Sequence, residues 1–486
     1  MRRADGLLPP LLFTLALAVA AAAPLALHAQ AAGAPARPQL SDAVRAFVAE
    51  DAPVIALTNV RVVDGTGAAP AEGRTIVIRD GRIAEVGPSA QVRVPQGARV
   101  LDLAGHTVIP GLVGMHNHTF YTTSARQAQI STSAPRMYLA SGVTTIRTTG
   151  SYHPYSEVNL KRAIERGLQP GPRMHITGPY ITGPSTGYMT GVMTPEDARR
   201  VVGYWADEGA TWFKAYTTIS SEAQKAAIDE AHRRGLKFTG HLCSVSFRQA
   251  VSLGIDNLEH GLFTNSDYAA DKEPDRCPGG LSRSLLAVDL NGPEVQATFR
   301  DMVANGVAMT STLAVYELSV PGRPPLEDRV LEAMAPEVRA EYLARREAIE
   351  RNAATSTTAE VFRKAQAFER AFVRAGGLLA AGVDPTGNGG ALPGYGDQRN
   401  YELLLEAGFT PPEVVQIMTL NGAKVLGVDA ELGSIERGKL ADLVVIRGDP
   451  VRTPAEIRNV TLVFKDGIGY DPAKLIESVK GQVGIR

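Results

Sequence analysis

The sequence predicts an α/β protein in which a (β/α)8 TIM barrel is inserted into a small β-sandwich domain formed from both termini. Strand-like and helix-like segments alternate through residues 109–430, a pattern typical of parallel sheets. Short β-rich runs separated by glycines occupy residues 53–108 and return in residues 431–486. Metal-compatible side chains end several candidate strands of the middle region, where barrel enzymes carry their active sites.

Residues 1–31 are predicted to be a secretory signal peptide. Arg2 and Arg3 supply its positive end, and residues 7–27 form an apolar run that prolines interrupt. A membrane anchor is the alternative, and it is disfavoured because the prolines shorten the uninterrupted run below the length of a membrane span. We therefore expect a secreted or periplasmic protein in which residues 32–52 form a linker.

The charge balance gives no sign of a nucleic-acid-binding or membrane-surface protein. The chain has 50 lysine and arginine residues against 51 aspartate and glutamate residues, for a net charge of −1. No run after the signal peptide is long and apolar enough to cross a membrane. The expected partner is a small-molecule or short-peptide substrate, and the sequence leaves a homo-oligomer open.

The β-sandwich is predicted because short β-rich runs separated by turn residues, a pattern typical of β-hairpins, occur at both ends of the mature chain. Asp64-Gly65 and Asp80-Gly81 supply turn signals between the first runs. Neither end has enough strands to bury a sheet face by itself, so we expect one domain built from both. The candidate strands are residues 54–58, 60–64, 75–79, 82–86, 99–103, 433–447 and 460–467.

The barrel is predicted from eight candidate strands with helical stretches between most of them, for example residues 195–208 and 221–234. Two segments exceed this pattern, residues 265–291 and residues 326–374, and we place both near the barrel mouth or on a partner surface. The eight candidate strands are residues 108–118, 143–147, 173–177, 212–216, 237–241, 256–260, 307–312 and 378–384.

The first barrel strand ends on two histidines, His116 and His118. Because side chains alternate across a strand, both imidazoles point the same way and are suited to one metal ion. A loop with two surface histidines is the alternative.

Four further groups stand at the ends of other candidate strands: Lys214 on strand four, His241 on strand five, His260 on strand six and Asp384 on strand eight. Each of these residues, taken by itself, could equally have a purely structural role. Together with the histidine pair they predict a metal site at one rim of the barrel.

Lys214 makes the predicted site binuclear. An ammonium repels a cation, so a lysine among four histidines is unexpected unless desolvation and metal charge remove its proton. The neutral amine could then react with carbon dioxide to give a carbamate, whose two oxygens can bridge two divalent metal ions.

These motifs resemble the amidohydrolase superfamily of metal-dependent hydrolases, and specifically its imidazolonepropionase-like subgroup with Xaa-Pro dipeptidases. The flanking runs at residues 108–112, 142–145 and 421–442 also match. The resemblance implies one metal on His116, His118 and Asp384, a second on His241 and His260, and carbamylated Lys214 between them. It also implies that Asp384 carries the proton from the attacking water to the leaving amine. Zinc is the default metal, and manganese or cobalt would also suit these ligands.

The sequence departs from this family where substrate is held. Gly114 stands where many relatives have an aspartate, and Arg147 lacks the usual following aspartate. Residues 183–187 replace a Gly-Gly-His, and Leu242-Cys243 replaces Ala-Tyr. A particular substrate is therefore not inherited from the resemblance.

Three residues are candidate substrate contacts. His153 follows strand two and could polarise a carbonyl, with an exposed loop histidine as the alternative. Tyr216 shares the face of Lys214 and could hydrogen-bond substrate. Arg399 follows strand eight and could hold a carboxylate, with a surface ion pair as the alternative. The two cysteines, Cys243 and Cys277, fall on neighbouring mouth loops, where a disulfide is one hypothesis.

The function expected from these observations is an exported binuclear amidohydrolase that cleaves an amide bond in a dipeptide or N-acyl amino acid. A cyclic amide, lactone or ester hydrolase on the same metal site is the first alternative. A non-catalytic exported binding protein on the same scaffold is the second.

Overall fold

The computed structural model describes residues 39–123, 127–184, 187–386 and 389–485. The predicted signal peptide, residues 1–31, lies outside these ranges. Among the helices in the described part of the chain, none combines the length and apolar character needed to cross a membrane.

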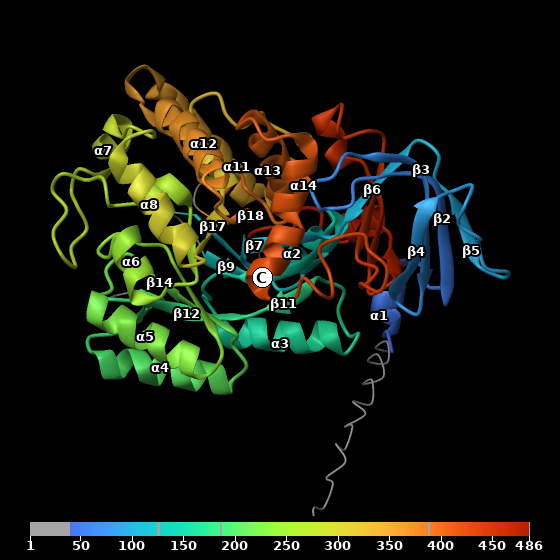
Figure 1. Ribbon diagram of the computed structural model, residues 1–486, viewed down its shortest axis with the longest axis horizontal. Helices are drawn as coiled ribbons and strands as arrows, with labels where there is room; N and C mark the ends of the chain where they lie inside the picture. Colours follow the sequence, from blue (N-terminus) through green and yellow to red (C-terminus); the bar gives the residue numbers. More distant parts are fainter. Residues whose placement is uncertain (1–38, 124–126, 185–186, 387–388, 486) are drawn as a thin grey trace, which may run out of the picture. The chain divides into compact units, whose positions relative to one another are not determined.

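Strands from both ends of the chain share one nine-stranded sheet in the described part of the chain (Figure 1). The two halves meet where β6 pairs antiparallel with β19, so that Pro110 lies opposite Leu443 and His106 opposite Arg447. The N-terminal strands are β2 (Val54–Val62), β3 (Ala71–Arg79), β4 (Arg82–Pro88), β5 (Arg99–Asp102) and β6 (His106–Pro110), and the C-terminal strands are β19 (Leu443–Arg447), β20 (Val460–Lys465) and β21 (Ile468–Tyr470).

The Asp80-Gly81 pair turns the chain between β3 and β4, as the sequence indicated. Both residues have positive φ, 50° and 82°, which is the backbone that a two-residue type I′ hairpin requires. Glycine has no Cβ to oppose this conformation, and aspartate tolerates it better than most residues.

Part of the segment that we expected to be a linker belongs to this sheet. Residues 42–50 form the short helix α1 (Asp42–Arg45) and strand β1 (Val48–Glu50), and Val48 pairs antiparallel with Tyr470. Val44 is buried and joins the hydrophobic core. The apolar residues of this stretch are too few for sequence periodicity to reveal, because their partner strand lies at the far end of the chain.

All eight predicted strands of the middle region are present, in two parallel sheets. One has the order β11-β10-β7, and the other has the order β13-β12-β14-β15-β16-β17-β18. Only Ile176 separates β11 from β12. The strands are β7 (Leu112–Asn117), β10 (Val143–Thr148), β11 (Arg173–His175), β12 (Thr177–Thr182), β13 (Thr190–Gly191), β14 (Trp212–Ala215), β15 (Lys237–Gly240), β16 (Asn257–Glu259), β17 (Ala308–Ser311) and β18 (Leu379–Ala381), with β8 (Phe120–Thr122) and β9 (Gln127–Gln129) forming a separate pair.

Helices alternate with these strands, which makes this region an α/β fold of the TIM-barrel type (Figure 1). Helix α4 begins where Thr194 and Asp197 cap each other, and α5 begins where the Ser220 hydroxyl accepts from the Ala223 amide. The helices are α2 (Ser133–Ala140), α3 (Pro154–Glu165), α4 (Pro195–Asp207), α5 (Ser221–Arg233), α6 (Phe247–Leu253), α7 (Leu281–Ala287), α8 (Pro293–Ala304), α9 (Leu313–Glu317), α10 (Asp328–Ala333), α11 (Pro336–Arg351), α12 (Thr358–Arg374), α13 (Tyr395–Glu406), α14 (Pro411–Met418), α15 (Leu420–Leu426) and α16 (Pro472–Glu477).

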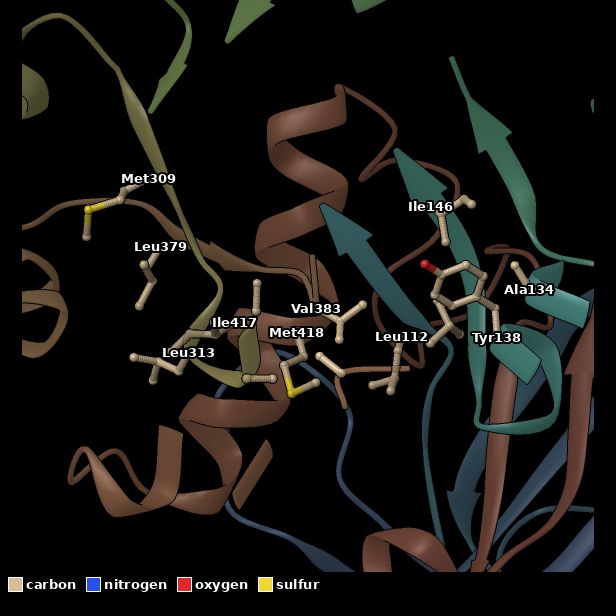
Figure 2. Close-up of a cluster of buried hydrophobic side chains, with 14 of the residues drawn as sticks. Leu112, Ala134, Tyr138, Ile146, Met309, Leu313, Leu379, Val383, Ile417 and Met418 are labelled. Atoms are coloured by element: carbon tan, nitrogen blue, oxygen red, sulfur yellow. The ribbon is translucent and has the colours of Figure 1, made fainter. Parts of the chain in front are cut away.

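The core lies between the parallel strands and the helices packed on them. Figure 2 shows apolar side chains of β7, β10, β17 and β18 gathered with those of α2 and α14, among them Leu112, Ile146, Met309 and Met418. This packing holds the strands in place and so fixes the positions of the groups at their carboxyl ends.

The two long segments contact loops at the carboxyl ends of strands, as expected. In the first, Lys272 donates to the Ser244 carbonyl at 2.7 Å, just after β15. In the second, Glu341 of α11 accepts a hydrogen bond from Thr123 at 3.1 Å, beyond β7 and β8. Both segments therefore border the region where the candidate ligands lie.

Candidate metal centre

The six predicted ligand side chains come together in one cluster. His116 lies in β7 and His118 just beyond it, Lys214 lies in β14, and the others follow the ends of β15, β16 and β18. The His116 ring centroid lies 5.3 Å from that of His118 and 4.6 Å from that of His260. The His241 ring lies 4.5 Å from His260. Asp384 completes the cluster, with Oδ1 3.2 Å from His118 Nε2 and 3.6 Å from His116 Nε2.

Two of the six have backbones in the left-handed region, His260 with φ 69° and Asp384 with φ 48°. This conformation is uncommon for residues other than glycine and clusters at functional sites. The His116 carbonyl accepts from the Asp384 amide at 2.8 Å, and the Thr310 carbonyl accepts from the His260 amide at 2.9 Å. These hydrogen bonds hold both turns and direct the two side chains into the cluster.

The protonation states of these groups are those of metal ligands. Burial lowers the pKa of His118 to about 4 and that of His241 to about 3, so both imidazoles are neutral at pH 7. Burial opposes ionisation of Asp384, but the neighbouring histidines outweigh it and hold its pKa well below the usual value. In the described part of the chain, His118 Nδ1 and His260 Nε2 are buried without a hydrogen-bond partner. A donor set of neutral imidazoles, a carboxylate and unpartnered nitrogens fits divalent metal ions.

Lys214 is buried among these ligands. Its Nζ lies 3.2 Å from His116 Nε2 and donates to the Thr149 carbonyl at 3.0 Å. Burial lowers the pKa of Lys214 to about 8, against the opposing charges of Glu259 and Asp384. The lowered pKa favours the uncharged amine, which is the form that carbon dioxide requires.

Sequence reasoning missed Glu259, a fully buried acid that contacts the cluster directly. Its Oε2 accepts from His116 Nδ1 at 2.7 Å, and its Oε1 accepts from Arg147 at 2.5 Å and from Asn257 at 2.9 Å. Burial opposes ionisation, but Arg147, His116 and Lys214 lower the pKa of Glu259 to about 2. Because His116 Nδ1 donates to this carboxylate, Nε2 is left facing Lys214 and Asp384. The only signal in the sequence was an acid inside a candidate strand, one residue before His260.

The structure explains why glycine stands at position 114, where many relatives have an aspartate. A Cβ at this position would lie 2.1 Å from Asn117 Nδ2, so the Asn117 amide occupies the space that a larger residue would need. The Asn117 side chain accepts from the Val383 amide at 3.2 Å and so connects β7 to the segment that carries Asp384.

Tyr216 lies beside the cluster, as predicted from its spacing to Lys214. Its ring centroid is 4.6 Å from that of His241, and Lys214 Nζ lies 5.8 Å from its ring. The residue is half-buried and reaches solvent next to the candidate ligands.

The predicted substrate role of His153 is not supported by its position. The residue is exposed at the start of α3, and its ring packs on Tyr152 at 4.1 Å. Tyr152 in turn contacts Phe120, which lies against His118. Two aromatic rings thus stand between His153 and the nearest of the six ligands along this path.

The carboxylate-binding role predicted for Arg399 is not supported by its contacts, which are ion pairs within the protein, with Glu317 fully buried rather than at the surface as the alternative had it. Its Nε and Nη2 donate to the two oxygens of Glu317 at 2.9 and 2.7 Å, and Nη1 donates to Glu402 at 2.5 Å. Arg399 lines a cavity of about 20 Å³ with Glu317 and Tyr395, which has room for a water molecule but not for a substrate. Glu402 lies one turn further along the same helix, but Glu317 comes from α9, 82 residues earlier, and spacing in the sequence does not reveal that contact.

Cys243 and Cys277 form a disulfide, with their Cα atoms 5.0 Å apart. The bond ties the loop after β15, which follows His241, to the long segment 265–291. The structure thus supports the predicted disulfide between these two cysteines.

The comparison with known families decides the identity of the fold and its chemistry. The amidohydrolase family profile matches residues 107–272 and 352–469, more than half of the chain. The chain belongs to the amidohydrolase family. All six cluster residues fall inside the matched blocks. Residues 273–351 fall between the blocks, and they include parts of both long segments together with α8, β17 and α9.

Named relatives agree with this assignment. The chain is 25% identical to the imidazolonepropionase of Porphyromonas gingivalis strain W83 over 414 residues, 81% of this chain and 86% of that protein. A putative prolidase from Bifidobacterium longum is 27% identical with a TM-score of 0.64, covering 88% of this chain and 98% of that one. A Xaa-Pro dipeptidase with bound methionine, 21% identical with a TM-score of 0.64, covers 86% of this chain and 100% of that one and shows the shared fold.

The predicted resemblance is therefore confirmed. This amidohydrolase is a hydrolase that acts on carbon–nitrogen bonds of small-molecule substrates. Its family generally uses divalent metals, and His116, His260 and Asp384 offer ligand atoms within 4.8 Å of one another for such an ion.

Proposed function

We propose that this amidohydrolase cleaves an amide bond in a dipeptide or N-acyl amino acid at a binuclear metal centre. The observation that carries the proposal is a buried lysine of lowered pKa inside a cluster of four histidines and one aspartate. One ion would be held by His116, His118 and Asp384. The other ion would be held by His241 and His260, and Lys214 would bind both ions. Zinc is the expected metal, because imidazole-rich ligand sets favour it.

Lys214 would bridge the ions as a carbamate. Its uncharged nitrogen bonds to the carbon of carbon dioxide and loses one proton, which leaves two oxygens and one negative charge. The proximity of His116 Nε2, 3.2 Å from Lys214 Nζ, supports this placement because both groups then face the same ion.

When bound, two divalent ions would supply Lewis acidity and a water of lowered pKa. Asp384 would take a proton from the attacking water and deliver it to the leaving nitrogen. Its side chain suits this role because it is held ionised by its neighbours and keeps 13% of its surface exposed toward the mouth.

Glu259 would act as a positioning residue for the metal centre. Replacing Glu259 with glutamine is expected to weaken metal affinity by about 10- to 100-fold, because a neutral amide holds His116 less firmly. It should also lower the free energy of unfolding by about 3–5 kcal/mol, because the Arg147 charge is left buried without a counter-ion. Metal-competition titration and denaturant unfolding measure the two effects.

The double variant Arg147→Met, Glu259→Gln separates these effects. It removes the buried charge, so stability should recover while metal affinity stays low. Metal affinity that recovers together with stability would show that Glu259 acts on the fold alone.

We also infer the finer architecture that the sequence predicted. The hydrogen bond from the Asp384 amide to the His116 carbonyl and the bridge between Ser151 and Pro179 support closure of the two parallel sheets into a (β/α)8 barrel. The β-sandwich is supported by one apolar cluster to which both ends of the chain contribute. It contains Leu57, Ile76, Leu443 and Phe464 among its buried residues.

Export remains part of the proposal. The disulfide between Cys243 and Cys277 is typical of proteins in an oxidising compartment and supports a periplasmic or secreted location. Sequencing the amino terminus of the mature protein from fractionated cells tests this. Cleavage near residue 31 is expected, and an intact amino terminus in the cytoplasmic fraction would contradict it.

The test of the function is a substrate screen with protein stripped of metal and then reconstituted with zinc, manganese or cobalt. Dipeptides and N-acyl amino acids should be hydrolysed, and the activity should disappear after chelation. Cyclic amides, lactones and esters belong in the same screen, because the same cluster would serve them. Failure to hydrolyse any linear amide would overturn the proposal, and hydrolysis of none of these compounds would favour a non-catalytic binding protein.

A further inference from the structure

Four tyrosines border the ligand cluster and have no part in the proposed hydrolysis. Tyr152 follows β10, Tyr180 lies in β12, Tyr188 precedes β13 and Tyr216 follows β14. Tyr152, Tyr180 and Tyr216 thus lie in or just after neighbouring parts of the parallel sheets, and Tyr188 lies between β12 and β13. We call this set the aromatic rim.

The rings of the aromatic rim contact one another from solvent inward. Tyr188 is 40% exposed, and its ring lies 5.2 Å from Tyr152 and 5.7 Å from Tyr180 in edge-to-face geometry. Tyr180 is buried, 5.3 Å from Tyr216 and 6.2 Å from His118. A chain of ring contacts therefore leads from the exposed Tyr188 through the buried Tyr180 to His118, and through Tyr216 to His241.

The rings of the aromatic rim carry no charge at neutral pH, because the tyrosine hydroxyl titrates only at about pH 10. The carboxylate-binding arginine expected nearby, Arg399, is occupied by Glu317 and Glu402. Arg399 is therefore not free to hold a substrate carboxylate, whereas the aromatic rim places rings beside the ligand cluster.

A purely structural role, in which Tyr188 only supports the surrounding loops, would not require its ring to be exposed. Edge-to-face packing on Tyr152 and Tyr180 holds Tyr188 in one orientation although much of its surface faces solvent. Aromatic rings that are ordered and still accessible are well suited to stack with a further ring or a large apolar group.

We propose that the aromatic rim binds an aromatic or large apolar side chain of the substrate, next to the scissile amide. This rests on the proposed amide hydrolysis and narrows its substrate class. Substrates with a small or charged side chain at that position should then bind more weakly and be hydrolysed less efficiently.

The test compares N-acetyl-L-phenylalanine with N-acetyl-L-alanine on the metal-reconstituted full chain. The wild type should prefer the phenylalanine compound. Tyr188→Ala should raise KM for it about three- to tenfold more than for the alanine compound, which is the effect of losing one or two ring contacts. Tyr188→Phe keeps the ring and should keep the preference. Tyr204→Ala is the matched control, since Tyr204 is 50% exposed and packs on Trp205 of α4.

Equal turnover of both compounds by the wild type, or an equal effect of Tyr188→Ala on both, would overturn the proposal while leaving amide hydrolysis in place. Calorimetric titration with free L-phenylalanine and L-alanine gives a readout that does not depend on hydrolysis. Tighter binding of phenylalanine that Tyr188→Ala weakens would support the aromatic rim even if neither amide is cleaved. Absence of that difference would contradict it.

Discussion

Replacing Lys214 with methionine should reduce the metal content from two ions to at most one and lower kcat/KM for an amide substrate on the order of 10³-fold. Methionine matches the length and apolar stem of lysine, so the buried position stays filled, but it cannot form a carbamate. The loss reflects the several kcal/mol of transition-state stabilisation that a metal centre supplies. Metal analysis and steady-state kinetics on the same preparation measure both effects.

Lys225→Met is the matched control, because Lys225 lies on the surface of α5 in an ion pair with Asp229. It should leave metal content and kinetics unchanged. Reconstitution of the wild type in buffer free of carbon dioxide should reproduce the Lys214→Met result, and added bicarbonate should reverse it. A Lys214→Met protein that binds two ions and retains its activity would contradict the bridging role.

Asp384→Asn should lower kcat on the order of 10²- to 10⁴-fold, because the amide cannot accept and deliver a proton at the reacting atoms. The loss should be smaller for an acyl p-nitroanilide than for an alkyl amide, because p-nitroaniline leaves without full protonation. Steady-state kinetics on this substrate pair, at matched metal content, isolates proton transfer from metal binding.

The control is Asp229→Asn on the surface of α5, which should affect neither substrate. Equal losses for both substrates at full metal content would show that Asp384 does not protonate the leaving nitrogen. It would then serve as a ligand alone.

The ligand cluster was predictable because its members occupy equivalent places in a repeated pattern. His116, Lys214 and Asp384 each end an apolar run, and parallel strands bring such ends to one edge. The alternation of side chains along a strand also placed Tyr216 correctly, two residues after Lys214.

The groups that the sequence did not reveal depend on partners distant along the chain. Glu259 is significant because it contacts His116, which lies 143 residues away, and its own strand gives no sign of that contact. The residue type and position of Arg399 fit a role in binding a substrate carboxylate as well as they fit an ion pair. Only the fold shows that its guanidinium already donates to Glu317. Strand β1 was hidden for the same reason, because its partner Tyr470 comes from the opposite end of the chain.

Native mass spectrometry of the reconstituted protein tests the binuclear centre most directly. After loading with zinc in the presence of bicarbonate and desalting, the proposal predicts one dominant species that carries two zinc ions and one carbon dioxide per chain. A chain that binds a single ion, or two ions without carbon dioxide, would contradict the account.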